Sequence, residues 1–208
     1  FRKCANSASS YQKDYSFVKG AYKNSLEGFL FPKTYSIGKD ASADDVVRMM
    51  LDQYQQEISP LDYSYAKKKG LSKYDVLIFS VIEKEAASDN RATVSSVFYN
   101  RLDKNMPLQS DATVAYVVGH DPSASDLTIS SPYNTYLNTR LPAGPICSPS
   151  IESLQAACQP ENTDYLYFYF AKDSNGDIQY YFSETYKQHQ QAIKEAQAAA
   201  SSSSSESN

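Results

Sequence analysis

The chain has 208 residues, of which 41% are hydrophobic and 21% are charged, and its formal net charge is −4 at pH 7. This length suits one sizeable domain, or one domain with a small appendage. A slightly acidic chain lacks the basic excess that nucleic-acid binding needs, so no nucleic-acid partner is expected. No run approaches the roughly 20 apolar residues of a membrane span, and no signal-peptide pattern opens the chain.

Both ends of the chain are expected to lie outside the folded core. Residues 1–20 are polar and poorly patterned, which predicts a loose N-terminal lead-in. Residues 201–208 are rich in serine and hold no apolar side chain, which predicts a disordered tail. The folded domain is therefore expected to span residues 21–200. Because the chain starts with Phe1 rather than Met, we expect it to be a trimmed or processed piece.

Helical patterns dominate the first half of the chain. Residues 43–57 have apolar side chains at helical spacing, and Ser42 is the candidate N-cap. The run 73–88 is too long for one strand and contains no Gly or Pro, which predicts one buried helix. A third helix is expected over about residues 90–102.

The next helix is expected within residues 108–118, with Ser110 or Asp111 as its cap. The stretch 131–149 must be a loop, because its prolines remove backbone donors and restrict their neighbours. Residues 150–157 are expected to be helical.

Aromatic-rich segments at 165–171 and 178–182 flank a strong turn signal at 173–177, which predicts a β-hairpin. A closing helix is expected over residues 185–199. Helices followed by a hairpin indicate an α+β fold, with helices packed against a small antiparallel sheet around one cleft.

Two acidic residues, Glu83 and Glu85, close the apolar run 76–82. At about 100° per residue they point to different sides of a helix, so they are not expected to share one site. Glu85 continues the apolar stripe, whereas Glu83 lies nearer a polar edge. Burial raises a carboxyl pKa, which makes Glu85 the better candidate for an acid that is still protonated near neutral pH. From this segment alone, a helix-end glutamate paired with a nearby Lys or Arg explains the pattern equally well.

An ordered series of short motifs runs from about residue 26 to residue 190. The series comprises Leu26-Glu27-Gly28-Phe29-Leu30-Phe31-Pro32-Lys33-Thr34-Tyr35, Val97-Phe98-Tyr99-Asn100-Arg101-Leu102, Met106-Pro107-Leu108-Gln109-Ser110-Asp111-Ala112-Thr113-Val114-Ala115-Tyr116, Ser131-Pro132-Tyr133-Asn134-Thr135-Tyr136, Leu141-Pro142-Ala143-Gly144-Pro145-Ile146, Tyr165-Leu166-Tyr167-Phe168, and Phe182-Ser183 with Thr185-Tyr186 and His189. Each motif is weak alone, but together their order and spacing are specific. The series resembles the YceG-like family of endolytic murein transglycosylases.

The resemblance implies a lytic transglycosylase with Glu85 as the catalytic residue and Glu83 in support. Such an enzyme cleaves the β-1,4 bond between N-acetylmuramic acid and N-acetylglucosamine without water and leaves a 1,6-anhydro end. It also implies a set of substrate-binding side chains: Asn100, Arg101, Gln109, Asp111, Tyr116, Tyr133, Asn134, Thr135 and Tyr136. In related transglycosylases a small hydroxyl residue follows the catalytic glutamate, whereas here Ala86 follows Glu85.

Two other classes of function stay open. One is a muramidase-like hydrolase, in which Asp111 or Asp89 holds a water as the second carboxylate. The other is a noncatalytic peptidoglycan-binding module, in which the loop tyrosines at 133–136 bind sugar and the glutamate is structural. The product of the reaction distinguishes these classes.

The resemblance names peptidoglycan strands as the partner, with cell-wall synthesis proteins as further candidates, on the extracytoplasmic face of the bacterial membrane. Attachment to the membrane would come from an N-terminal anchor that this chain lacks. No cofactor is expected, because the chain has only 7 Gly and no phosphate-binding glycine loop. No metal is expected, because the two histidines lie far apart in the sequence and the three cysteines do not have the spacing of a zinc site. Cys147 and Cys158 are expected to be unlinked thiols.

Overall fold

The computed structural model of the chain describes residues 1–86, 88–173 and 176–203. Its α-helices are α1 (Arg2–Ala5), α2 (Ala43–Ile58), α3 (Ser64–Lys68), α4 (Lys73–Phe79), α5 (Ile82–Glu85), α6 (Arg91–Asp103), α7 (Asp111–Val118), α8 (Ile151–Cys158) and α9 (Tyr186–Ser203). The strands are β1 (Tyr167–Lys172) and β2 (Ile178–Ser183). Short 3-10 turns lie at Ala8–Ser10, Ser16–Val18, Tyr22–Asn24, Ser88–Asn90 and Asp126–Thr128.

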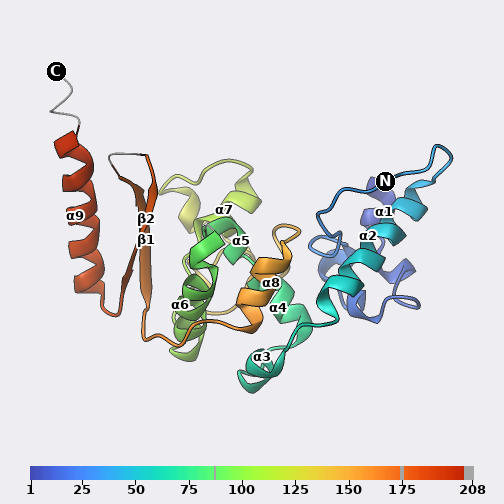
Figure 1. Cartoon of the computed structure of the whole chain (residues 1–208), viewed down its shortest axis with the longest axis horizontal. Coiled ribbons are helices and arrows are strands. Elements are labelled where there is room, and N and C mark those ends of the chain that lie inside the picture. Colours follow the sequence, from blue (N-terminus) through green and yellow to red (C-terminus); the bar gives the residue numbers. More distant parts are fainter. Residues whose placement is uncertain (87, 174–175, 204–208) are drawn as a thin grey trace.

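The molecule is elongated, with three groups of elements along its length (Figure 1). Helices α1 and α2 form the N-terminal end, helices α4 to α8 form the centre, and the hairpin with α9 forms the other end. The two strands pair antiparallel, from Tyr167 opposite Ser183 to Lys172 opposite Ile178. The expected α+β class is confirmed.

Two hydrophobic clusters hold these groups together. One packs the central helices around Phe79 and Phe98, and partly buried side chains of the hairpin join it. The other packs the N-terminal segment against α2 around Leu51. Helix α4 serves both clusters, since Leu77 belongs to the second and Phe79 to the first. The N-terminal end and the centre are thus joined through the core.

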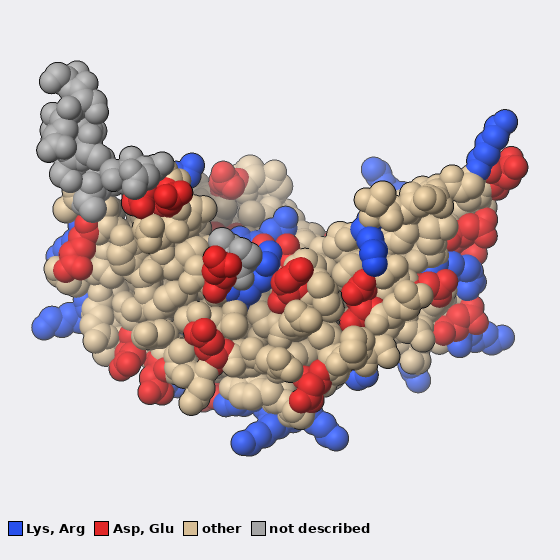
Figure 2. Space-filling view, in the orientation of Figure 1, with Lys and Arg blue, Asp and Glu red and all other residues tan. Residues whose placement is uncertain are grey.

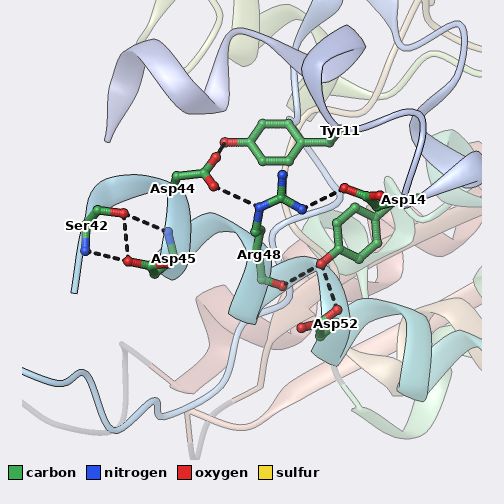
Figure 3. A network of polar contacts seen from close by, with 8 residues as sticks. Tyr11, Asp14, Ser42, Asp44, Asp45, Arg48 and Asp52 are labelled. Carbon is green, nitrogen blue, oxygen red and sulfur yellow. Dashed lines mark hydrogen bonds and ion pairs between the residues drawn. The ribbon is translucent and has the colours of Figure 1, made fainter.

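The N-terminal segment is packed, which differs from the loose lead-in that we expected. Tyr11 and Tyr15 are only 2% and 6% exposed. Their hydroxyls donate to Asp44 and Asp52 of α2, each at 2.7 Å. Arg48 of α2 adds an ion pair to this contact region (Figure 3). Both tyrosines bury their rings while their hydroxyls remain hydrogen-bonded. The average polarity of the segment, on which the expectation of a loose lead-in rested, does not reveal two buried aromatic rings among polar residues.

Several expected helices form close to the expected bounds. Helix α2 begins with a capping box, in which Ser42 and Asp45 exchange side-chain and backbone hydrogen bonds. Helices α6, α7 and α8 correspond to the segments expected at 90–102, 108–118 and 150–157. The loop 131–149 contains neither helix nor strand.

The prediction of a single helix over residues 73–88 is wrong. Helix α4 ends at Phe79, and the chain resumes as the four-residue helix α5 at Ile82. Ser80 leaves helical geometry with ψ of 8°, and its hydroxyl donates to the Leu77 carbonyl. A serine hydroxyl that binds a nearby carbonyl competes with the helix ladder, which accounts for the break.

The C-terminal helix is longer than expected. Helix α9 continues to Ser203, so the first residues of the segment expected to be disordered are helical, because each added residue gains one backbone hydrogen bond. Residues 204–208 of that segment lie outside the described residues. Cys147 and Cys158 are free thiols. Among the described residues, no helix has the length and apolarity needed to cross a membrane.

Candidate active site

Helix α5 carries both acidic residues, Glu83 and Glu85. Each of them contacts the N-terminus of a different helix. The Glu85 carboxylate accepts hydrogen bonds from the start of α7, and the Glu83 carboxylate accepts them from the start of α8. The first N–H groups of a helix have no partner within the helix and carry partial positive charge, so carboxylates suit both places. The two acids therefore serve separate regions, as the helical spacing predicted.

Ser110 is the direct partner of Glu85. Its hydroxyl donates to Glu85 Oε1, and the backbone N–H of Ala112 donates to the same carboxyl group. Ser110 occupies the N-cap position of α7, yet its side chain makes no capping hydrogen bond. The hydroxyl that would ordinarily cap the helix is used to orient the carboxyl group of Glu85 instead.

Burial raises the pKa of Glu85 above its ordinary value, and the negative charge of Asp111 adds to the rise. The hydrogen bonds from Ser110 and Ala112 oppose this rise without cancelling it. A carboxyl group with a raised pKa holds its proton closer to neutral pH, as a general acid must.

Glu85 opens onto a cleft of about 480 Å³. Its walls come from α5, α7, the loop after α7, the proline-rich loop and strand β1, through Lys84, Glu85, Asp111, Ala112, Ala115, Tyr116, Asp121, Pro122, Ile146 and Phe170. The hairpin also contacts the backbone beside the acid, since the Tyr180 hydroxyl donates to the Glu85 carbonyl at 3.4 Å. An acid held at the wall of an open cleft can reach a ligand.

A larger groove of about 830 Å³ lies between the hairpin and α9. Its two glutamates, Glu184 and Glu195, are exposed. A general acid is ordinarily held away from bulk water, as Glu85 is and these two glutamates are not. The Glu85 cleft is therefore the better candidate for acid catalysis, despite its smaller volume.

Glu83 has the opposite electrostatic character. Burial raises its pKa, but the hydrogen bonds from Ser153 and Ser150 and the charge of Arg91 outweigh that effect, and the pKa is lowered overall. Glu83 Oε2 accepts from the Ser150 N–H at 3.0 Å and from the Ser150 hydroxyl at 2.7 Å. An ionised group with its oxygens engaged in this way ties α5 to α8.

Four of the predicted binding residues gather at or beside the cleft. Asp111 and Tyr116 line it together with Glu85. Tyr136 donates its hydroxyl to Asp111, and the Tyr133 ring lies 4.9 Å from the Tyr116 ring.

Two residues of the same loop lie inside the protein instead. Asn134 is 1% exposed, and its amide donates to the carbonyls of Leu127 and Ile129 at 2.9 Å. Thr135 is fully buried, and its hydroxyl accepts from the Ser110 N–H at 3.0 Å. The resemblance implied that both side chains bind substrate, whereas in the structure their polar atoms fix the loop and the start of α7.

Two further predicted residues, Asn100 and Arg101, bond the segment that leads into the hairpin, and a third, Gln109, bonds Arg101. The Asn100 amide donates to the carbonyls of Thr163 and Tyr165, at 2.8 and 2.9 Å. The buried Arg101 guanidinium donates to the Leu166 carbonyl and to Gln109 Oε1, at 2.6 and 3.2 Å. These contacts support the strand that brings Phe170 to the cleft, and none of the three side chains lines the cleft itself.

Sequence reasoning missed the serines that hold the two acids. Ser110 was considered only as a helix cap, and the contact of Ser150 and Ser153 with Glu83 was not foreseen. The available signal was a serine at each helix start, but the sequence does not say which carboxylate a cap hydroxyl will meet. Among the described residues, no group of three or more His, Cys, Asp or Glu side chains could hold a metal ion.

Residues 2–195 match the model of the YceG-like family. The chain belongs to this family. It is 44% identical over 176 residues to a protein of Bacillus subtilis strain 168 named endolytic murein transglycosylase, a match that covers 82% of this chain and 48% of that protein. It is 36% identical over 180 residues to a Streptococcus pneumoniae D39 protein of the same name, covering 82% of this chain and 32% of that one. The chain thus spans about half or less of the length of these relatives.

A crystal structure of a YceG-like protein from Listeria monocytogenes is similar in fold, with a TM-score of 0.79 and 37% sequence identity. The similarity covers 91% of this chain and 66% of that chain. The family fold thus includes nearly all of the elements described above.

Proposed function

We propose that this chain is the catalytic part of an endolytic murein transglycosylase. The observation that carries the proposal is the Glu85 carboxyl group, whose pKa is raised by burial and which Ser110 holds at the wall of an open cleft. The names of the relatives support peptidoglycan as the substrate.

In the proposed mechanism, Glu85 acts twice. The protonated carboxyl group first donates its proton to the glycosidic oxygen as the bond from the N-acetylmuramic acid C1 breaks. The carboxylate then takes the proton from the C6 hydroxyl of the same sugar, whose oxygen bonds to C1 and closes the 1,6-anhydro ring. No water is consumed, and Glu85 returns to its protonated form. The hydrogen bonds from the Ser110 hydroxyl and the Ala112 N–H at the start of α7 would stabilise the intermediate carboxylate.

Asp111 gives a specific reason to test a second mechanism. It lines the cleft with Glu85, and a pair of carboxylates could instead activate water for hydrolysis. We favour the transglycosylase because the Tyr136 hydroxyl donates to the Asp111 carboxylate and occupies one of its oxygens.

The remaining roles follow from the cleft. Asp111 and Tyr116 would contact the glycan, Tyr133 and Tyr136 would support them, and Asn100, Arg101, Gln109, Asn134 and Thr135 would hold the cleft in shape. On the face shown in Figure 2, acidic and basic side chains of the described residues are interspersed, which suits a sugar polymer better than a polyanion. The substrate would place this part of the protein on the extracytoplasmic face of the membrane, with cell-wall synthesis proteins as candidate partners.

Replacement of Glu85 tests the proposal. Glu85→Gln keeps the shape and accepts the Ser110 hydrogen bond but cannot cycle a proton, so cleavage should fall by ~10⁴-fold, the upper end for one acid–base group. Products from purified glycan strands are analysed by mass spectrometry. Anhydro ends from the parent and none from Glu85→Gln are expected, with Glu184→Gln as the matched control. Reducing ends would indicate a muramidase, and full activity of Glu85→Gln would exclude this residue.

A further inference from the structure

A second cavity, of about 220 Å³, adjoins the Glu85 cleft. Its lining includes Tyr22, Lys23, Glu27, Tyr116 and Tyr133. Tyr116 lines both cavities, so one ring forms a wall shared between them. A chain-like ligand long enough to pass Tyr116 would contact both cavities.

Glu27 is the acidic residue of this second cavity, and its partial burial is not explained by a bonding partner. Its side chain is partly buried, and burial alone raises its pKa. Within the part of the chain that the structure describes, no group donates a hydrogen bond to the Glu27 carboxylate or forms an ion pair with it. The nearby Lys23 ammonium instead lies over the Tyr22 ring, at 5.5 Å. A desolvated carboxylate without a partner is costly, and a ligand that donates hydrogen bonds would offset the cost.

The backbone around Glu27 is held in place. Leu26 is fully buried, and its N–H donates to the Ala5 carbonyl at 2.7 Å. Gly28 has φ of +85°, and a Cβ at this position would lie 2.6 Å from Pro145 Cβ. Glu27 thus stands between two tightly packed neighbours, on a turn that no side chain at position 28 would permit. The backbone that carries the carboxylate is therefore already in place before a ligand binds.

Tyrosine rings line the same cavity as Glu27. The Tyr133 ring contacts Tyr22 edge to face at 5.7 Å and lies 4.9 Å from Tyr116. Gly144 allows the approach, because a Cβ there would lie 3.1 Å from the Tyr133 hydroxyl. Flat apolar rings with hydroxyl groups, in one cavity with an acceptor carboxylate, match a sugar ring that has apolar C–H faces and hydroxyl donors at its edge.

We propose that Glu27, Tyr116 and Tyr133 form a subsite for a sugar of the glycan strand that lies beyond the residues at the scissile bond. The carboxylate accepts hydrogen bonds from hydroxyl or acetamido N–H groups of that sugar, and the rings contact its faces. The proposal rests on the proposed function, since it assumes that the Glu85 cleft holds the same strand. It makes the affinity for the strand depend on strand length.

Binding is measured in the Glu85→Gln background, which keeps the ligand intact. The probes are peptide-free strands of alternating N-acetylglucosamine and N-acetylmuramic acid, separated by length, and the dissociation constant is determined by calorimetry. Glu27→Ala should weaken binding of the longer strands about tenfold, the effect of losing one hydrogen bond to a charged group. The shortest strands that bind should change by less than about twofold. Glu152→Gln on exposed α8 surface removes the same charge elsewhere and should bind as the background does.

A second variant covers the case in which Glu27→Ala does not fold. Glu27→Gln keeps the size of the side chain and removes only its charge, so it should fold and should weaken binding of the long strands in the same way. Equal loss at every length, or no loss in either variant, would overturn the subsite. The measurement is repeated with strands of the same lengths that carry peptides. A loss of binding seen only with these strands would also overturn the subsite, because it would assign the cavity to the peptide. If the parent chain cleaves strands and the variants bind them normally, the subsite alone is refuted. If the parent chain neither binds nor cleaves strands, the proposed function is refuted.

Discussion

At the scale of single residues, the site separates two glutamates that are two positions apart. Glu85 has a raised pKa because burial dominates, and Glu83 has a lowered pKa because hydrogen bonds and Arg91 dominate. Environments that push two carboxyl groups in opposite directions commonly separate an acid from a supporting charge. The same residue type therefore provides a proton donor and a structural anion on one short helix.

The raised pKa of Glu85 predicts how stability depends on pH. Below the ordinary pKa of glutamate, Glu85 is protonated in both the folded and the unfolded chain. As pH rises, the unfolded chain loses this proton first, so the folded state is penalised until the folded pKa is passed. Glu85→Gln does not titrate, so it should be more stable than the parent at pH 8, with a difference that shrinks toward pH 4.

Thermal melting of both proteins at pH 4, 6 and 8 measures this effect. A constant difference in melting temperature across this range would contradict it. Glu152→Gln serves as the control, because it makes the same chemical change on the exposed surface of α8.

Part of the site could be predicted from residue patterns. Glu85 follows from its place in an apolar run, because an acid among aliphatic side chains needs a reason to be there. Asn134 and Thr135 could not be separated from Tyr133 and Tyr136, since all four share one polar loop. Thr135 turns inward through contacts with residues 22–25 positions away, such as Ser110, whereas Asn134 turns inward to bond the carbonyls of Leu127 and Ile129.

At the scale of elements, the four-residue helix α5 links two longer helices. It is too short to be stable by itself, so contacts with its neighbours must hold it. The break at Ser80 gives α5 its own direction, separate from α4. The periodicity of residues 73–88 does not reveal this break, because Ser80 is 1% exposed and fits the buried pattern of its neighbours.

The contact of Glu83 with α8 predicts a structural effect. Glu83→Ala leaves the hydroxyls of Ser150 and Ser153 and the N–H of Ser150 without their acceptor. Hydrogen bonds to a charged group contribute about 1.5–3 kcal/mol, so the free energy of unfolding should fall by about 2 kcal/mol at pH 7. Urea denaturation measures this loss.

The loss should diminish in acid. The folded pKa of Glu83 is lowered, so its contribution is present above the ordinary pKa of glutamate and is lost as pH falls through the folded pKa. Glu184→Ala, at an exposed position, should change stability by no more than about 0.5 kcal/mol. If Glu83→Ala were as mild as this control, the tie between α5 and α8 would be unimportant.

At the scale of the whole molecule, the N-terminal segment belongs to the core. Ala8, Tyr11, Tyr15 and Val18 are buried in the cluster that also contains Leu51 of α2. This burial was not predicted from the sequence, because the apolar residues of this segment are few and are spread among many polar ones. Their burial depends on α2, which lies some 30 positions further along the chain (Figures 1 and 3).

Removal of residues 1–18 should therefore destabilise the whole chain. Burying one large apolar side chain contributes about 1.5–3 kcal/mol, and the deletion removes three that are nearly fully buried, Tyr11, Tyr15 and Val18. The loss is comparable with the roughly 5–15 kcal/mol by which domains are stable, so cooperative unfolding should be lost or its midpoint sharply lowered. Removal of residues 204–208 is the control, since they contain no apolar side chain. An unchanged melting temperature after the N-terminal deletion would mean that the central helices fold without the N-terminal end.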